Sequence, residues 1–234
     1  MLEPFGPDLW LSDGPVVTGA AGFRFPTRMA VVRLPDGGGL WVWSPVALTN
    51  ALRAEVEALG PVRHIVAPNS LHHLFVAAWS KFWPEAQIHA APGCQALGVD
   101  ASTPLSDVPC PAWAGVLDQV VVPGNRITTE VVFFHRPSAT VLVTDLVQQL
   151  PRDWFHGWRK LVARLDLMSA PVPSVPRKFR LATTDRKVAG AAVAHILKWP
   201  VERLVMAHGA PVKSGAREVL SAAFDRLRPH ISEA

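Results

Sequence analysis

Imidazole and carboxylate side chains follow three separate apolar runs of the sequence. His72 and His73 stand shortly after one run, Asp145 directly after a second, and His208 directly after a third. Functional groups of α/β proteins gather where strands end and loops begin, and imidazole with carboxylate suits a divalent ion such as Zn, Mn or Fe(II). These residues lie far apart in the chain, and each also has a structural interpretation: a surface histidine pair, a capping aspartate, a loop histidine. The pattern is therefore consistent with a metal site, but it can also be explained without one.

Four further polar residues are candidates for chemistry at such a site. His135 follows an apolar run and His156 lies in a basic segment, so both are candidate general acid–base groups or anion donors. Asn69 and Asn125 are candidates for orienting a carbonyl or phosphoryl oxygen of a substrate. Each of the four also has a structural interpretation, since histidine is common in loops and on surfaces and asparagine favours turns.

Short strands precede these residues, and amphipathic segments lie between the strands. Apolar runs bounded by turn residues predict strands at 29–34, 40–43, 64–67, 87–90, 119–122, 131–134, 141–144 and 201–206. Apolar residues at helical spacing predict helices at about 49–59, 71–83, 153–165, 187–199 and 216–227. Thr49, Asp153 and Asp185 are the predicted N-caps. The order of these elements favours a layered α/β fold with two sheets and helices outside them.

Composition narrows the class of protein. The chain has 234 residues, of which 49% are hydrophobic and 18% charged, enough apolar surface for one large domain and too much for a disordered chain. Scattered proline and glycine exclude a long coiled coil. The sequence has no apolar run of the ~20 residues that cross a bilayer and no signal-peptide pattern at its start, so we expect a cytoplasmic protein with no membrane partner. Two cysteines are too few for a disulfide framework or a cysteine-based metal site.

Charge is concentrated in one segment. Residues 152–187 contain nine Lys or Arg and three Asp, against a net charge of +4 for the whole chain. A basic patch beside a site attracts anions, although such a segment is also typical of a solvated face. The basic residues form no known nucleic-acid motif, so no nucleic-acid partner is expected. A Trp-rich helix from Asp153 has three candidate placements: a lid over a pocket, a homodimer contact, or packing on the core of its own domain.

The candidate ligands resemble the metal-binding motifs of the metallo-β-lactamase superfamily, over residues from about Met1 to Leu227. The superfamily's first motif, His-x-His-x-Asp-His, corresponds to Pro68-Asn69-Ser70-Leu71-His72-His73, in which only the final histidine is kept. Its Pro-Gly-His turn is Pro123-Gly124-Asn125 here, its bridging aspartate is Asp145, and its histidine before glycine is His208. The sequence is similar to a branch of this superfamily whose function is unknown.

The resemblance implies a four-layer αβ/βα sandwich, with two mixed β-sheets and helices on the outer faces. We expect a single domain over residues 1–234, with a basic, Trp-rich helical insertion at about 151–180. In dinuclear members one metal uses the first two histidines and the turn histidine, and this chain has lost all three. The positions of the other metal hold His72, His73, Asp145 and His208. The resemblance therefore implies one divalent ion, Zn or else Mn or Fe.

The function implied by the resemblance is metal-dependent hydrolysis of a small, anionic ester, lactone or thioester. A metal-bound water would be the nucleophile, and Asp145 and His72 are the residues to which a catalytic role is assigned, Asp145 orienting the water. The alternative is a non-catalytic protein of the same fold that binds a ligand or partner and uses any metal structurally. The sequence does not separate these two hypotheses.

Overall fold

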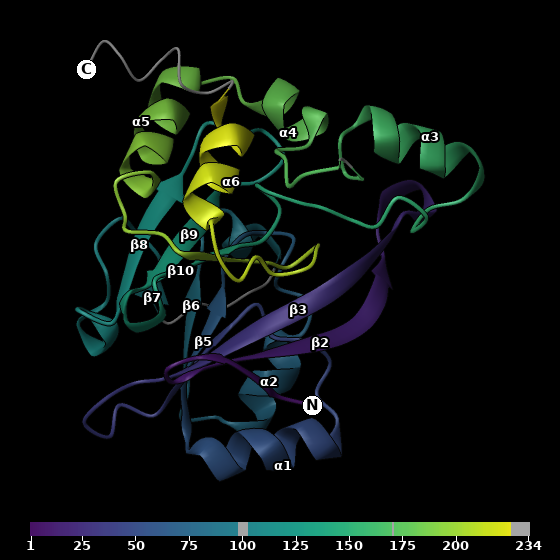
Figure 1. The fold of residues 1–234 in the computed structure, drawn as a ribbon. Coiled ribbons are helices and arrows are strands. Elements are labelled where there is room, and N and C mark those ends of the chain that lie inside the picture. Colours follow the sequence, from purple (N-terminus) through teal and green to yellow (C-terminus); the bar gives the residue numbers. More distant parts are fainter. Residues whose placement is uncertain (98–102, 170, 226–234) are drawn as a thin grey trace.

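Two β-sheets face each other in the computed structural model, which describes residues 1–97, 103–169 and 171–225 (Figure 1). The strands of the first sheet, in their spatial order, are β1 (Glu3–Gly6), β2 (Leu9–Thr18), β3 (Arg24–Arg33), β4 (Leu40–Trp43), β5 (Val62–Ala67), β6 (Gln87–Ala90) and β7 (Thr103–Pro104). Neighbouring strands are antiparallel from β1 to β4 and parallel from β4 to β7, so this sheet is mixed. The predicted hairpin of 29–34 with 40–43 is the pairing of β3 with β4.

The second sheet supplies the other half of the core. Its strands, in spatial order, are β11 (Arg203–Met206), β10 (Thr140–Val143), β9 (Glu130–His135) and β8 (Leu117–Val122). Only β10 and β11 are parallel. Successive side chains of β9 point to opposite faces: Phe133 packs inward against Trp41 of the first sheet, with ring centroids 4.9 Å apart, while Phe134 packs outward against Trp199.

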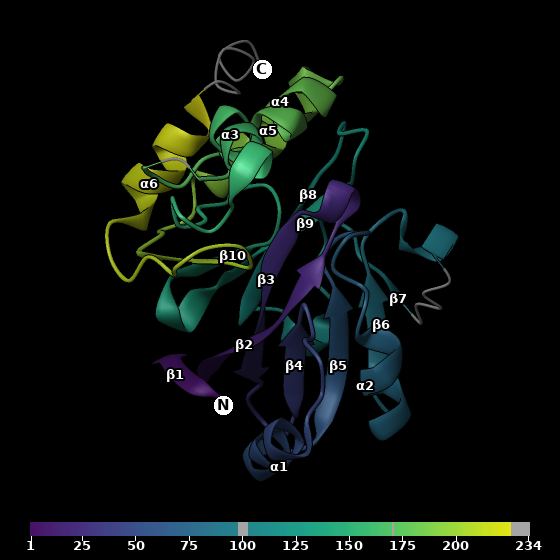
Figure 2. The ribbon, with the colours of Figure 1, turned by 90° about the vertical axis from the view of Figure 1, so that its right-hand side faces the viewer.

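Helices cover the outer faces of both sheets. The α-helices are α1 (Asn50–Leu59), α2 (Val76–Phe82), α3 (Gly157–Leu165), α4 (Arg177–Ala182), α5 (Arg186–Ile196) and α6 (Ala216–Ala223). Short 3₁₀ segments are η1 (Ala20–Gly22), η2 (Cys94–Leu97), η3 (Pro111–Trp113) and η4 (Arg136–Ser138). Figure 2 shows α2 and α6 on opposite outer sides of the two sheets, which confirms the predicted four layers. Across the described ranges, no helix combines the length and apolar content needed to span a bilayer.

Two of the predicted helix caps are formed as the sequence indicates. The Thr49 hydroxyl accepts a hydrogen bond from the Leu52 N–H at 3.2 Å, and Gly60 ends α1 with φ +144°. The Asp185 carboxylate accepts from the Val188 N–H at 3.1 Å and starts α5. Each of these bonds satisfies a backbone donor that the first turn of a helix leaves free.

The second predicted helix begins later than the sequence indicates. α2 starts at Val76 and not near Leu71. The Asn69 side-chain oxygen accepts the backbone N–H groups of Leu71 and His72 at 2.8 and 3.0 Å, and this local turn competes with helix formation.

The third predicted helix also begins later, and its predicted cap is wrong. α3 starts at Gly157 with His156 at the N-cap, because Pro151–Trp154 forms a turn first, with the Trp154 N–H donating to the Pro151 carbonyl at 3.1 Å. α4 was not predicted. The end of the last predicted helix, at 226–227, lies outside the described residues.

Candidate metal centre

Three strand ends bring the candidate ligands together. β10 and β11 are parallel with Val143 opposite Met206, so Asp145 and His208, each two residues further on, emerge side by side. His72 comes from the other sheet, on the turn that follows β5. The Val131 N–H donates to the Pro68 carbonyl at 2.8 Å and ties this turn to the second sheet. The site therefore lies between the two sheets, at the carboxyl ends of β5, β10 and β11.

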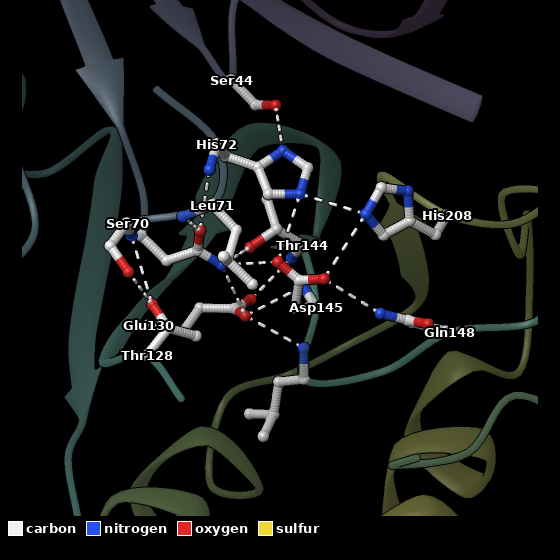
Figure 3. Close-up of polar contacts among 12 residues, drawn as sticks. Ser44, Ser70, Leu71, His72, Thr128, Glu130, Thr144, Asp145, Gln148 and His208 are labelled. Atoms are coloured by element: carbon white, nitrogen blue, oxygen red, sulfur yellow. Dashed lines mark hydrogen bonds and ion pairs between the residues drawn. The ribbon is translucent and has the colours of Figure 1, made fainter. Parts of the chain in front are cut away.

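The three side chains converge on one point (Figure 3). His72 Nε2 lies 3.1 Å from His208 Nε2 and 3.3 Å from Asp145 Oδ2, and His208 Nε2 lies 3.4 Å from Asp145 Oδ1. Two donors that bind a tetrahedral zinc ion at about 2.0–2.2 Å are about 3.3–3.6 Å apart. The three side chains are only 6–8% exposed. Their spacing fits a shared divalent ion.

Hydrogen bonds on the far side of each imidazole orient the two rings. His208 Nδ1 lies 2.8 Å from the Pro26 carbonyl oxygen, and since a carbonyl can only accept, Nδ1 is the donor. In the neutral ring Nε2 therefore carries a lone pair. That lone pair faces the acceptor oxygens of Asp145. His72 Nδ1 lies 2.9 Å from the Ser44 hydroxyl, which leaves its Nε2 directed at the same point. Either a proton on His72 Nε2 or a metal ion can join these three groups, since the Ser44 hydroxyl can donate to or accept from His72 Nδ1.

The Asp145 carboxylate is held by two amide side chains. Asn69 Nδ2 donates to Asp145 Oδ2 at 2.9 Å, and Gln148 Nε2 donates to Oδ1 at 3.0 Å. Asn69 also donates to the Thr144 hydroxyl at 2.8 Å, and its side chain is fully buried. Asn69 therefore positions the carboxylate in this structure, and its role in orienting a substrate oxygen stays a prediction.

Glu130 is a functional residue that the sequence interpretation missed. Its buried carboxylate accepts the backbone N–H groups of Thr144, Asp145 and Leu146 at 2.6, 2.9 and 2.9 Å, which fixes the turn that carries Asp145 (Figure 3). Burial and the nearby Asp145 charge raise the pKa of Glu130 to about 7. A lone glutamate at the start of the apolar run 131–134 was the available signal, because an acidic residue is rarely buried without partners.

Electrostatics favour the protonation states that bind a metal. Burial by itself raises the pKa of Asp145, but the imidazoles of His72 and His208 outweigh it and hold that pKa well below its usual value. Burial lowers the pKa of His72 more than the Asp145 charge raises it. A carboxylate anion and a neutral imidazole are the forms that ligate divalent ions.

The loop that carries His208 is clamped from the first sheet. The Arg28 guanidinium donates to the Met206 carbonyl at 2.9 Å and to the Gly209 carbonyl, while Asp13 holds its other edge at 2.6 Å. A Cβ at Gly209 would lie 2.9 Å from the Gln149 carbonyl oxygen, so the residue after His208 must be glycine for the loop to approach this backbone.

Ser70 and Asn125, which the resemblance aligns with ligands of the other metal, are engaged in structural hydrogen bonds. Ser70 Oγ bonds the Thr128 hydroxyl at 2.8 Å. Asn125 Nδ2 donates to the Phe179 carbonyl at 2.8 Å and to the Thr183 hydroxyl at 3.0 Å, which ties the turn after β8 to α4. The role of Asn125 in orienting a substrate oxygen also stays a prediction. Both side chains therefore make loop-to-loop contacts.

The remaining predicted site residues lie apart from the three-donor group. His73 Nδ1 donates back to the Ser70 carbonyl at 2.8 Å, and His73 is not one of the three clustered side chains. His135 is fully buried at the other end of β9 from Glu130, where it bonds Ser138 at 2.7 Å, and burial lowers its pKa to about 4. His156 is exposed before α3. A catalytic role for His135 is therefore not supported by its position, and the roles of His73 and His156 stay predictions.

Comparison with solved structures identifies the fold. The metallo-β-lactamase of Hirschia baltica superposes with a TM-score of 0.61 at 13% identity, covering 98% of both chains. The mono-zinc form of the metallo-β-lactamase FIM-1 of Pseudomonas aeruginosa gives 0.63 at 13% identity, covering 97% of this chain and 96% of that chain. The structure of TMB-1 gives a TM-score of 0.65 at 12% identity, covering 100% of this chain and 98% of that chain. The chain therefore has the metallo-β-lactamase fold, as the resemblance implied.

Sequence comparison finds one family. The model of the family described as Domain of unknown function (DUF4336) matches residues 17–156. No curated protein sequence matches the chain. This agrees with the predicted placement in a branch of unknown function. The matched range includes His72, Asp145 and Glu130, whereas His208 lies beyond it.

Proposed function

The chain belongs to the family described as Domain of unknown function (DUF4336) and has the metallo-β-lactamase fold, and we propose that it is a metal-dependent hydrolase with one ion per chain. The observation that carries the proposal is the convergence of His72, Asp145 and His208 from both sheets, with one ligand atom of each within 4.8 Å of the others. A divalent ion bound there would polarise a scissile oxygen and lower the pKa of a water molecule.

One ion is proposed because the described part of the chain holds one group of three such donors. The Ser70 and Asn125 side chains are used in structural hydrogen bonds, and Pro68 has no donor side chain. The solved mono-zinc form of FIM-1 shows that a protein of this fold can be isolated with a single zinc. We propose Zn, with Mn or Fe as the alternatives, held by the three clustered residues. His73 stays a prediction as a fourth ligand.

The residues of this chain supply the framework for the reaction. Ser44 and Pro26 fix the two imidazoles, while Asn69, Gln148 and Glu130 fix the Asp145 carboxylate. A ligand set that is already held in place loses little freedom in the transition state. Asp145 would remain anionic throughout the neutral pH range and accept a hydrogen bond from a nucleophilic water.

A small, anionic ester, lactone or thioester is the proposed substrate. The Lys178 ammonium lies 5.4 Å from the centre of the Phe25 ring, and that ring lies 5.3 Å from the His208 ring, while a carboxylate oxygen of Asp166 lies 3.6 Å from the same ammonium. Lys178 belongs to the basic segment 152–187, whose net charge of +6 would raise the local concentration of anions.

Metal analysis combined with a hydrolase screen tests the proposal. Protein purified without chelator should contain one transition-metal ion per chain, and removal of that ion should abolish hydrolysis of a panel of esters, lactones and thioesters. Addition of Zn, Mn or Fe(II) should restore activity. One tightly held ion without hydrolysis of any class would favour the non-catalytic alternative, and two ions per chain would overturn the mononuclear site.

Substitution of Lys178 tests the substrate charge. Lys178→Ala should raise KM for an anionic substrate about tenfold and leave KM for its neutral analogue unchanged. Lys187→Ala is the matched control, since that lysine is exposed on α5. An equal change for both substrates would show that Lys178 acts through structure and not through charge.

A further inference from the structure

The sides of α3 differ in chemical character. Trp158, Leu161 and Leu165 are 55%, 60% and 55% exposed and form an apolar stripe along one side of the helix. At about 100° per residue, Lys160 and Arg164 lie about 130° and 90° around the helix from the centre of that stripe. These two cations therefore belong to a different surface from the apolar stripe.

Contacts with the tip of the β2–β3 hairpin fix the orientation of α3. The Trp154 indole donates to the Arg24 carbonyl at 2.8 Å, and the Arg159 guanidinium donates to the Ala21 carbonyl at 3.0 Å. Figure 1 shows α3 beside the far ends of β2 and β3, at the margin of the molecule. The helix is therefore anchored from this hairpin, and Arg159 is used as one of the anchors.

A cavity of about 550 Å³ lies on the side of α3 that carries the other two cations. Its lining includes the cations Arg152, Lys160 and Arg164 and one acidic side chain, Asp153. None of the three cations has an ion-pair partner within the part of the chain that the structure describes. Cavities of roughly 300–1,000 Å³ are the usual size of small-molecule sites. The volume and the unpaired positive charge both fit a small anionic ligand.

Hydrogen bonds between the two segments that flank α3 build the cavity. The Leu150 N–H donates to the Met168 carbonyl at 2.8 Å, and the Gln149 side chain donates to the carbonyl of Pro171, a lining residue, at 2.9 Å. The Gln149 N–H also donates to the His208 carbonyl at 2.9 Å. The wall of the cavity is therefore fixed to the loop of a proposed metal ligand, although none of the three clustered ligands lines it.

An apolar wall accompanies the cations. Leu167, which lines the cavity together with Pro171, has φ +66° where α3 ends. The Met168 N–H donates to the Ala163 carbonyl at 2.9 Å, which is the bonding pattern of a helix end at which glycine is normally found. Leucine is strained in this conformation, so its presence is explained better by the cavity that it lines than by the helix end.

The charges of the lining favour a ligand with two negative charges. Lys160 and Arg164 are four residues apart on α3, and like charges at this spacing repel each other. With Arg152 and Asp153, the lining has a net charge of +2. A phosphate monoester carries about −1.5 to −2 at neutral pH, and guanidinium groups bind two of its oxygens at once. The hydroxyl of Ser169, another lining residue, can donate to a third oxygen.

We propose that this cavity binds a phosphorylated small molecule. Arg152, Lys160 and Arg164 would hold the phosphoryl group, and the organic part would lie against Leu167 and Pro171. The site is separate from the three clustered metal ligands, so the proposal does not depend on the proposed hydrolase activity.

Calorimetric titration of the full chain with phenylphosphonate tests the site. At about pH 8 this probe has about two negative charges on a phosphoryl group and one apolar ring. We expect it to bind, and benzenesulfonate, which has the same ring and one negative charge, to bind at least about fivefold more weakly. No binding of phenylphosphonate at about 10 mM would overturn the proposal. Equal binding of the two probes would overturn the assignment to a doubly charged group.

Removal of metal separates the cavity from the metal centre. Because His72, Asp145 and His208 do not line the cavity, the chelator-treated chain should bind phenylphosphonate as tightly as the untreated chain. Loss of binding after this treatment would place the probe at the metal centre and overturn the cavity site. Either result is independent of whether the chain hydrolyses an ester.

Charge variants test the three cations. Lys160→Gln with Arg164→Gln, and Arg152→Gln alone, should each weaken phenylphosphonate binding at least about tenfold, because charge-assisted hydrogen bonds are lost. Arg186→Gln with Lys187→Gln is the matched control, since these two exposed residues belong to the same basic segment and do not line the cavity. The control should change the affinity less than about twofold. Equal losses in folded test and control variants would show that only net charge matters and would overturn the site.

Leu167→Gly tests the apolar wall. Glycine adopts φ +66° without strain, so the end of α3 should be retained, as circular dichroism can verify. The variant should bind phenylphosphonate about threefold or more weakly than the wild type and inorganic phosphate equally well. An unchanged affinity for phenylphosphonate would overturn the placement of the organic group against this wall.

Discussion

Two pairs of histidines in this protein have nearly the same geometry and different surroundings. His72 and His208 bring ring nitrogens within 3.1 Å, with ring centroids 5.0 Å apart and planes at 46°. His64 and His89 do the same at 3.1 Å, 5.2 Å and 48°. The first pair faces the Asp145 carboxylate, whereas the second packs its rings in T-shaped contacts against Trp113. Two close imidazoles are therefore not enough to indicate a metal site.

The surroundings decide what each pair can do. Around the first pair, Ser44 and Pro26 fix the rings and an anion completes the donor set. Around the second pair, burial lowers the pKa of His89 to about 4, and its Nδ1 has no hydrogen-bond partner in the structure. The first pair is arranged to share a cation, and the second is arranged to stay neutral in the core.

The largest expected effect comes from removing the Asp145 carboxylate, which is present at the first histidine pair and absent from the second. Asp145→Asn should lower the metal content from one ion per chain to less than about a tenth and reduce any hydrolysis at least about 10³-fold. Elemental analysis and circular dichroism measure metal and fold. His89→Gln is the matched control and should keep the ion. Unchanged metal content in Asp145→Asn would contradict the proposed ligand set.

The framework of the first pair should contribute strongly to stability. Glu130→Ala leaves three buried N–H groups of residues 144–146 without an acceptor, so the free energy of unfolding should fall by about 3–5 kcal/mol. Glu130→Gln keeps one side-chain oxygen and should lose less. Urea denaturation measures both values. A loss below about 1 kcal/mol for Glu130→Ala would show that the turn is held by other contacts.

The second histidine pair should make the free energy of unfolding decrease as the pH falls. Because the pKa of His89 falls from 6.5 in the unfolded chain to about 4 in the folded chain, the unfolded state binds its proton first as pH drops. His89 should therefore cost the fold about 3 kcal/mol between pH 7 and pH 4. The free energy of unfolding of His89→Gln should fall less than that of the wild type by this amount. Parallel pH profiles would contradict a neutral, buried His89.

Loss of an orienting hydrogen bond at the first pair should weaken the metal site without abolishing it. Ser44→Ala removes the partner of His72 Nδ1, and metal affinity should fall about 10–100-fold, as measured by competition with a chelator. Ser12→Ala is the matched control, because Ser12 is equally buried and its hydroxyl has no partner in the structure. Equal affinities for both variants would show that His72 is oriented by its backbone alone.

The smallest effect is expected at the neighbour of His72. His73→Ala should keep one ion per chain, because the His73 ring bonds the Ser70 carbonyl and lies outside the three-donor group. His72→Ala should lose the ion. Elemental analysis of the two variants separates adjacent residues that the sequence alone treats alike. Loss of the ion from His73→Ala would restore the four-ligand set predicted from the resemblance.

Local patterns made much of the fold predictable. The Thr49 and Asp185 caps, the hairpin of β3 and β4, and the strands that end before His72, Asp145 and His208 all follow from residues close together in the chain. The starts of α2 and α3 were misplaced because Asn69 and the Pro151 turn override helix propensity. The Asn69 side chain accepts the N–H groups of Leu71 and His72, and the Pro151 carbonyl accepts the N–H of Trp154, so each segment forms a turn before its helix can begin.

The sequence by itself determined which residue types stand at the ends of the strands, because strand and turn preferences act over a few residues. Only the tertiary structure decided that Asp145, His72 and His208 share one point while His64 and His89 do not, since that depends on how the two sheets pack. It also decided that Glu130 and Asn69 serve the Asp145 turn and that α3 turns its apolar stripe outward. Each of these facts is set by contacts between segments that are distant in the chain, and local preferences carry no information about them.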